Sequence, residues 1–430
     1  MGGKAAQGCV PVGETHYEAM RHNFRGLLGV LILASQPSTL AAQASTKDSA
    51  GVRIVESTRP SWPAGRAWTI SPEPAIDIGS GEDSLYELNT VMGAVRLSDG
   101  TIAVANMGTN NIRVYDARGR YVRVVGRQGQ GPGEFRQVMG LVRRPGDTLA
   151  VIDSRDEVEL YSADGKYARV MKSLSRQGGL VLGGFYVFDD GSFARTSWPQ
   201  GHNHPDGRWI DTLVVLAITK TDSQGRIISR HPAMEFTKTA ALPFPQPVTF
   251  GPGGFIVSTG DGYYVGYADR YEIRRHRLDG SLELILRAPW TPQPISDRDK
   301  ERYKHFTINL GAEGGGQVDP RLLAQRKKMM DEVSFARNLP AYQTMLVDSD
   351  RNLWVSDSNI EWFFGQGFSR VLSTPVSWRV FDRTGRWSGS VTTPARFRPM
   401  DIGSDYVLGL WRDADDVEHV RMYRLTKPGS

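Results

Sequence analysis

The sequence predicts an all-β chain that folds as a six-bladed β-propeller, a ring of four-stranded antiparallel sheets. The first observation is a repeated phrase: residues 78–93 and 125–140 both carry Ile-Gly or Val-Gly, followed at the same spacing by Val-Met-Gly. The second is a texture of short runs rich in Val, Ile, Leu and Tyr, separated by hairpin signals such as Ser-Asp-Gly at 98–100. A repeat at fixed spacing indicates stacked units, and radial repetition of small sheets leaves only short protected edges.

The first repeat is the template for the other blades. Its strands, lettered A to D in chain order, are expected at 92–97, 101–106, 111–116 and 121–126. A second blade is expected over about 138–175. The third, fourth and fifth blades are placed by their A–B and C–D turns, at 189–191 and 223–225, 251–254 and 279–280, and 348–352 and 383–385.

The sixth blade begins at about Met400 and supplies three strands. Its D strand is expected at 75–79, because Ile78-Gly79 aligns with the end of a D strand and has no A, B or C strand before it. An N-terminal strand would therefore close the ring, which removes the last open sheet edge.

The best-preserved repeat resembles an NHL repeat. The resemblance lies in residues 99–106, 110–116 and 126–135, the last reading Gly-Arg-Gln-Gly-Gln-Gly-Pro-Gly-Glu-Phe, with Asn106 where that repeat usually has Asp. The chain is also similar to six-bladed propeller proteins, mostly of unassigned function, among exported bacterial proteins. This resemblance implies the propeller fold, and it implies binding more often than catalysis.

The N-terminal residues 1–44 are expected to be an upstream segment and a signal peptide. A basic stretch at 20–25 precedes a short apolar core at 27–34 and a small-x-small cleavage site at 42–44, and Met20 is an alternative start to Met1. The apolar core is too short to span a bilayer, so we expect an exported chain, periplasmic or extracellular after cleavage near Ala44, with no transmembrane span. Residues 45–67 are expected to be a linker, and 68–430 the propeller.

Net charge and cysteine content limit the classes of partner and of covalent framework to be expected. The formal net charge is +5 over 430 residues, which is too small to indicate nucleic-acid binding. The single Cys9 indicates no disulfide framework.

Insertions gather on one face of the predicted ring. The D–A and B–C connections share that face, and they lengthen at 198–211, 233–247, 261–270, 289–342 and 358–375. Long loops on a rigid scaffold commonly carry binding sites. The longest insertion, about 290–342 between blades 4 and 5, is expected to hold two helices, because Ser296 with Asp299 resembles a capping box and Asp319-Pro320 resembles a helix start. It either packs over the blade or forms a lid on the channel.

Aromatic, histidine and arginine residues on this face are the candidate ligand-binding residues. Exposed aromatic side chains are typical anchors for peptides, glycans or partner proteins, although a satellite core is the alternative. His202 and His204 could point two imidazoles the same way, but two ligands do not make a metal site, and a polar loop is the simpler interpretation. The full set is His202, His204, Tyr263, Tyr264, Trp362, Phe363, Phe364, Arg127 and Arg136.

No sequence signature of catalysis stands out. Residues 348–352 imitate half of a calcium loop, but Leu353 replaces the required glycine, so a hairpin turn is expected. Glu134 and the equivalent Glu87 are expected to cap their own loops more readily than to form an acid–base pair. We therefore expect an exported non-catalytic binding or scaffold protein without a cofactor, which recognises a peptide, glycan or envelope protein. The alternative is a metal-dependent enzyme, similar to propeller lactonases or lyases, with calcium or zinc in the central channel.

Overall fold

The computed structural model describes residues 43–79, 83–155, 157–172, 185–197, 213–222, 224, 226–237, 248–310, 319–364 and 371–428. All of them belong to one compact unit, Ala42–Ser430. The expected signal peptide therefore lies outside the described residues, apart from Gln43 and Ala44.

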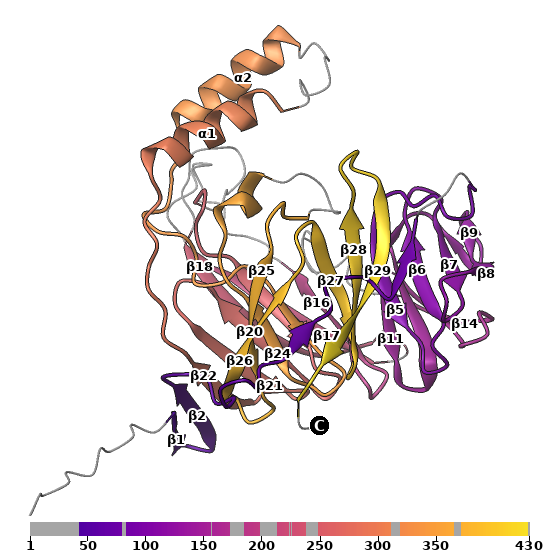
Figure 1. The fold of residues 1–430 in the computed structure, drawn as a ribbon, viewed down its shortest axis with the longest axis horizontal. Coiled ribbons are helices and arrows are strands. Elements are labelled where there is room, and N and C mark those ends of the chain that lie inside the picture. The colour runs from indigo at the N-terminus through magenta and orange to yellow at the C-terminus, as the bar shows by residue number, and fades with distance from the viewer. Residues whose placement is uncertain are drawn as a thin grey trace, which may run out of the picture. The chain divides into compact units, whose positions relative to one another are not determined.

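Six blades follow one another along this unit (Figure 1); five contain four consecutive antiparallel strands in the order A to D, and the sixth contains three, β27 to β29, completed by a strand from the N-terminal part of the chain. The strands of blades 1 to 3 are β5 (Val91–Arg96), β6 (Ile102–Asn106), β7 (Asn111–Tyr115), β8 (Tyr121–Val125), β11 (Val138–Arg144), β12 (Thr148–Asp153), β13 (Glu157–Tyr161), β14 (Tyr167–Lys172), β15 (Phe185–Val187), β16 (Phe193–Ser197), β17 (Leu213–Thr221) and β18 (Ile227–Thr237). Those of blades 4 to 6 are β19 (Gly254–Ser258), β20 (Gly262–Tyr267), β21 (Glu272–Arg277), β22 (Leu282–Arg287), β23 (Met345–Val347), β24 (Leu353–Ser356), β25 (Val376–Phe381), β26 (Trp387–Thr393), β27 (Phe397–Ile402), β28 (Tyr406–Arg412) and β29 (Glu418–Thr426).

The burial of each strand reflects its place in its blade. Every residue of β6 is buried, because a middle strand is covered by the neighbouring blades on both faces. The outer strand β8 alternates instead, and its Val122 and Val124 are exposed. The inner A strands contact one another from blade to blade, for example β5 with β11 and β27, and β19 with β15 and β23. The A strands therefore surround the central channel.

The ring closes as the sequence predicted. β4 (Ile76–Ile78) pairs antiparallel with β29, and Ile78 lies opposite Val420. The short β3 (Thr69–Ile70) pairs with the end of the same strand. The six-bladed propeller with an N-terminal closing strand is thus confirmed.

The expected linker at 45–67 is instead part of the folded unit. β1 (Ala44–Ser49) and β2 (Val52–Ser57) form a hairpin, and β2 runs parallel to β22, so blade 4 becomes a six-stranded sheet. The backbone N–H of Trp62 then donates to the Ser388 carbonyl at 2.7 Å, and the Trp62 ring covers Gly389 in β26. The segment therefore runs along the outer strands of blades 4 and 5 before it closes blade 6.

Blade 4 differs from the prediction in register. Residues 251–254 do not form its A–B turn, because 251–253 belong to the D–A connection and Gly254 begins β19. The A–B turn is 259–261, where the Thr259 N–H donates to the Gly262 carbonyl at 2.9 Å. Tyr263 and Tyr264, expected on a loop at 261–270, consequently lie in β20 and are buried.

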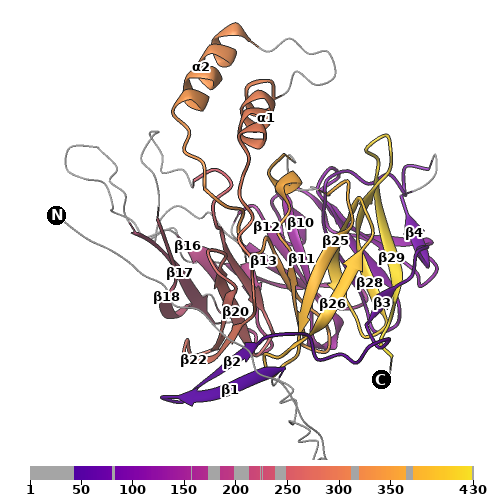
Figure 2. The same cartoon turned by 60° about the vertical axis from the view of Figure 1, so that its left-hand side comes forward.

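The insertion between blades 4 and 5 holds two helices, as expected, and they lie side by side in Figures 1 and 2. The first is α1 (Asp297–Ile308), with Ser296 accepting from the Asp299 N–H, and the second is α2 (Pro320–Asp331), with Asp319 as its N-cap. A satellite cluster at the base of the insertion surrounds Phe250 and joins it to the 3-10 helix η3 (Ile360–Phe364). The remaining short elements are β9 (Arg127–Gln128), β10 (Glu134–Phe135) and η1 (Pro145–Asp147).

Candidate functional site

The two mouths of the central channel differ. On the face of the A–B turns, a polar contact joins each pair of neighbouring blades. These contacts are Ser98 N–H to Asp147 (3.0 Å), Arg144 to the Phe188 carbonyl (3.2 Å), Asp189 N–H to the Gly260 carbonyl (2.9 Å), Arg351 to Asp261, Ser349 N–H to the Ile402 carbonyl (2.8 Å), and Arg96 to Asp405 (3.6 Å). This mouth is therefore braced around the whole ring.

The opposite mouth, on the face of the D–A and B–C loops, holds a cavity of about 370 Å³. The inner strands of blades 1, 2, 5 and 6 and the B–C loop of blade 5 form its walls. This channel-mouth cavity is lined by Met92, Gly93, Ala94, Leu141, Gln343, Thr344, Leu346, Ser356, Asp357, Trp362, Val371, Leu372, Val376, Trp378, Phe397, Arg398, Pro399 and Met400. Its lining is mostly apolar, and its size is that of a small ligand pocket.

Three polar residues of the cavity, Gln343, Thr344 and Ser356, hold its own loops. The Asn359 N–H donates to Gln343 Oε1 at 2.7 Å, and Gln343 Nε2 donates to the Asn359 carbonyl at 2.7 Å. The Thr344 N–H donates to Ser356 Oγ at 3.1 Å, and the Ser356 N–H donates to the Thr344 carbonyl at 3.0 Å. Gln343 is only 3% exposed, whereas its partner Asn359 is half-buried. These groups fix the B–C loop of blade 5 to the inner strand.

Among the candidates with a described position, Trp362 alone lines the channel-mouth cavity. It lies on η3, and the preceding residue of the same helix, Glu361, forms an ion pair with Arg302 of α1 at 2.7 Å. Phe363 and Phe364 point the other way, into the satellite cluster around Phe250, with ring centroids 5.0 and 6.3 Å from it. These two side chains thus follow the satellite-core alternative, and they anchor the helix that carries Trp362.

A second cavity of about 310 Å³, the side cavity, adjoins the first at Asp357, which lines both. It lies between the D–A connection of blade 4 and the B–C loop of blade 5. Its lining residues are Pro289, Trp290, Thr291, Gln293, Ala341, Asp357, Ser358 and Arg379. The lining of the side cavity is mostly polar, whereas the lining of the channel-mouth cavity is mostly apolar.

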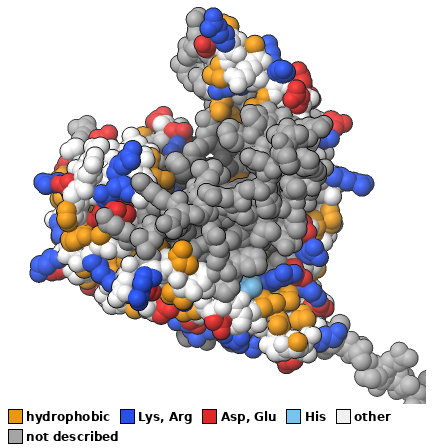
Figure 3. Space-filling model, turned by 180° about the vertical axis from the view of Figure 1, so that it is seen from behind, with side chains coloured by type: hydrophobic (Ala, Val, Ile, Leu, Met, Phe, Trp, Pro, Cys, Tyr) orange, Lys and Arg blue, Asp and Glu red, His pale blue; other side chains and the backbone are white. Residues whose placement is uncertain are grey.

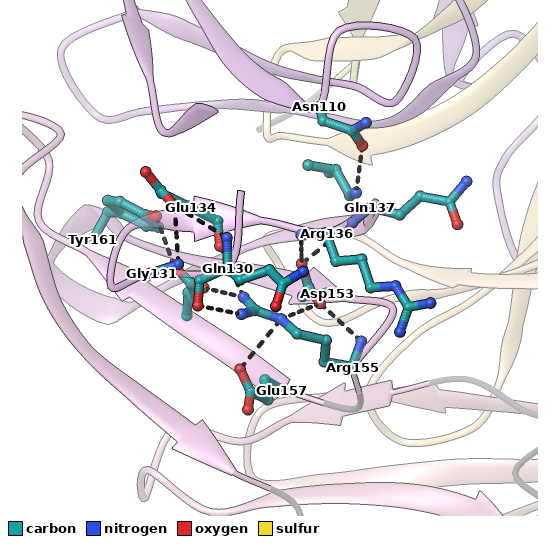
Figure 4. A network of polar contacts seen from close by, with 12 residues as sticks. Asn110, Gln130, Gly131, Glu134, Arg136, Gln137, Asp153, Arg155, Glu157 and Tyr161 are labelled. Atoms are coloured by element: carbon teal, nitrogen blue, oxygen red, sulfur yellow. Dashed lines mark hydrogen bonds and ion pairs between the residues drawn. The ribbon is translucent and has the colours of Figure 1, made fainter. Parts of the chain in front are cut away.

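The glycine-rich loop of the repeated phrase is self-contained (Figure 4). Glu134 Oε2 accepts from the Gly131 N–H at 2.9 Å and the Gln130 N–H at 3.0 Å, while Oε1 accepts from Arg127 at 2.8 Å. The Gly131 bond first, and then those from Arg127 and Gln130, lower the pKa of Glu134 below its ordinary value. Glu134 therefore caps its own loop, as the sequence indicated.

A half-buried cation, Arg155, joins this loop to blade 2. Arg155 donates to Asp153 at 2.8 Å (Figure 4), to Glu159 at 2.9 Å and to the Glu134 carbonyl at 2.8 Å. Arg136 contributes its backbone N–H to Asp153 at 2.7 Å, and its side chain is exposed. Arg127 and Arg136 are not among the residues that line either cavity.

The remaining candidates lie elsewhere. Tyr263 and Tyr264 are core residues, and burial raises the pKa of each to about 12. His202 and His204 fall outside the described residues. The segment 348–352, which imitates half of a calcium loop, is a hairpin turn, in which Asp348 accepts from the Asn352 N–H at 2.8 Å.

Apart from Trp362, the residues that line the channel-mouth cavity were not predicted from the sequence. Met92 belongs to the repeated Val-Met-Gly phrase, which set the register of the blades but was not considered as a site. The A strand of each blade begins at the loop face, so its first residues reach the channel mouth. Applied to β23 and β27, that rule selects Leu346 and Phe397 as well.

Charges on the described surface are mixed. In Figure 3, Lys and Arg side chains are interspersed with Asp and Glu side chains. Among the residues with a described position, no group of three or more His, Cys, Asp and Glu side chains could hold a metal ion. None of the described helices is long and apolar enough to cross a membrane.

The chain is a six-bladed β-propeller, and comparison with known proteins agrees on this class. Residues 87–173 match a family described as "6-bladed beta-propeller". No curated protein matched the chain.

Solved structures are similar in fold. A member of the duf4221 family from Bacteroides vulgatus has 9% identity and a TM-score of 0.50, over 84% of this chain and 99% of that one. A Bacteroides fragilis protein described as exported has 14% identity and a TM-score of 0.46, over 87% and 99%. A virginiamycin B lyase from Staphylococcus aureus has 11% identity and a TM-score of 0.38, over 84% and 99%. At these identities the likeness concerns the fold alone.

Proposed function

We propose that this chain is an exported, non-catalytic binding propeller that accepts an apolar side chain of a peptide or protein partner in the channel-mouth cavity. One observation carries the proposal: this mouth of the channel holds a mostly apolar concavity, and its polar side chains Gln343, Ser356, Asp357 and Arg398 each bond to the protein itself. Of the two mouths, only this one holds such a cavity among the described residues, and the other is braced from blade to blade.

The lining favours an apolar side chain over a sugar. A hydroxyl group loses its bonds to water when it enters a cavity, and it needs new partners to recover that cost. The walls formed by Met92, Leu141, Leu346 and Met400 offer none. An apolar side chain gains from the same walls about 25 cal/mol for each Å² removed from water.

Rigid support also favours binding. Trp362 is carried by η3, which is held by Gln343 through Asn359 on one side and by the satellite cluster on the other. A preorganised aromatic wall costs little conformational entropy on binding, and tryptophan is enriched among residues that dominate binding energy.

Export is proposed from the N-terminal sequence pattern. The small-x-small site ends at Ala44, which is the first residue of β1. Cleavage after Ala44 would remove the first residue of β1 and leave the rest of that hairpin and all six blades.

Selection of ligands from a phage-displayed library of random linear peptides tests the proposal. We expect the selected peptides to share one apolar or aromatic position. Because a central aromatic residue often contributes about 2 kcal/mol, Trp362→Ala should weaken their binding by about thirtyfold. Tyr167→Ala is the matched control, since Tyr167 is 37% exposed on the outer strand of blade 2.

Two results would contradict the proposal: selected peptides without a shared apolar position, or binding that Trp362→Ala and Tyr167→Ala affect equally. The metal-dependent enzyme remains an alternative prediction. Elemental analysis of the purified mature protein tests it, because stoichiometric calcium or zinc would favour the enzyme.

A further inference from the structure

The side cavity is built from fixed polar groups. Arg379 donates to the Pro289 carbonyl at 2.7 Å and to Asp357 Oδ1 at 3.2 Å. Its guanidinium also lies over the rings of Tyr271 and Trp387, 4.6 and 5.0 Å from their centroids. Contacts on several sides leave Arg379 little freedom, so the floor of the side cavity is preorganised.

Hydrogen-bonding capacity remains in this cavity. Ser358 Oγ is buried and has no hydrogen-bond partner within the described part of the chain. Asp357 is 41% exposed, and only Oδ1 accepts from Arg379. Thr291 and Gln293 lie exposed at the rim. A buried hydroxyl normally has a partner, so Ser358 is the group here that a ligand would satisfy.

The charges of the side cavity cancel. Asp357 and Arg379 form an ion pair. A ligand carboxylate attracted by Arg379 would be repelled by Asp357, and a ligand ammonium attracted by Asp357 would be repelled by Arg379. A neutral amide or hydroxyl can donate to Asp357 and exchange a hydrogen bond with Ser358 without either penalty.

We infer that the side cavity is a second subsite for the same peptide ligand and that it takes a neutral hydrogen-bonding side chain, Asn, Gln, Ser or Thr. This inference rests on the proposed function. The two cavities adjoin at Asp357, so one extended segment spans both of them. Side chains two positions apart point to the same side of an extended peptide. The neutral polar residue is therefore expected within two positions of the apolar one.

The same displayed library tests the inference. On the wild-type protein, the selected peptides should combine an apolar position with a neutral polar one within two residues of it. Asp357→Asn leaves Arg379 without a balancing charge, so selection on this variant should change the second position to Asp or Glu. Asp350→Asn is the matched control, because Asp350 lies in an A–B turn on the opposite face.

A second variant keeps the test independent of folding effects at Asp357. Ser358→Ala should weaken a selected wild-type peptide about three- to tenfold. The same variant should bind a peptide with alanine at the polar position as tightly as the wild type does.

The outcomes separate the two claims. Peptides with an apolar position but no neutral polar preference, or no effect of Ser358→Ala, would overturn the second subsite and leave the proposed function standing. Peptides without the apolar position would overturn both. An unchanged second position on a folded Asp357→Asn variant would also overturn the inference.

Discussion

The buried amide of Gln343 offers the sharpest test of how the channel-mouth cavity is held. Substitution of Gln343 by Met keeps the length and most of the volume of the side chain. It removes the acceptor for the Asn359 N–H and the donor to the Asn359 carbonyl, both at 2.7 Å. The B–C loop of blade 5 then loses both hydrogen bonds that join Asn359 to the Gln343 side chain, next to the inner strand β23.

The magnitude follows from these two bonds. A buried intramolecular hydrogen bond contributes about 0.5–1.5 kcal/mol, and more is lost when its partner stays unsatisfied. Asn359 is half-buried, so water can replace part of the loss. We therefore expect Gln343→Met to lower the free energy of unfolding by about 2 kcal/mol. Because η3 follows the loop directly, peptide binding at Trp362 should weaken as well.

Urea denaturation of the mature protein measures the loss of stability, and hydrogen exchange at the Asn359 amide locates it. Gln137→Met is the matched control, since Gln137 is exposed, and it should change stability by less than about 0.5 kcal/mol. Equal stability of the two variants, with an Asn359 amide as protected as in the wild type, would refute the reasoning.

Three further predictions concern the frame of the ring. Gly389→Ala should destabilise the protein, because the new Cβ would overlap the Trp62 ring, whereas Gly253→Ala meets only ordinary contacts; thermal unfolding compares them. Burial raises the pKa of Asp77, but hydrogen bonds, first from His419, outweigh it and lower that pKa below 3.8. The stability that Asp77 contributes is therefore present above about pH 4 and lost as pH falls through the folded pKa, so wild type and Asp77→Asn should converge in acid; a constant difference would contradict this. Salt should weaken the ion pair of Arg351 with Asp261, so Arg351→Ala should cost less stability at high salt, and an equal cost would count against an electrostatic brace.

Much of the ring could be predicted because its signals are local. The hairpin turns and the repeated phrase place the strands of blade 1 within a residue or two of β5 to β8. The capping side chains Ser296 and Asp319 likewise mark the helix starts. The hairpin of β1 and β2 carries no such signal, because β2 pairs with β22, far along the chain. Its short polar strands therefore looked like a linker.

The candidate site was harder to predict because no single segment contains it. Four blades contribute to the channel-mouth cavity, with Met92 and Met400 near opposite ends of the propeller sequence. Aromatic density favoured Tyr263 and Tyr264, but the misplaced turn at 251–254 put them on a loop when they belong to β20. Trp362 could be predicted because it lies in a long insertion. That its neighbours Phe363 and Phe364 belong to a satellite core is shown only by their packing around Phe250.

Hydrogen–deuterium exchange of the mature protein with and without a selected peptide tests the central claim most directly. We predict slower exchange in the inner strands β5, β23 and β27 at the loop face, and in the B–C loop of blade 5 around Trp362. The A–B turns on the braced face should exchange at the same rate in both states. Protection confined to those A–B turns, with none around Trp362, would contradict the account.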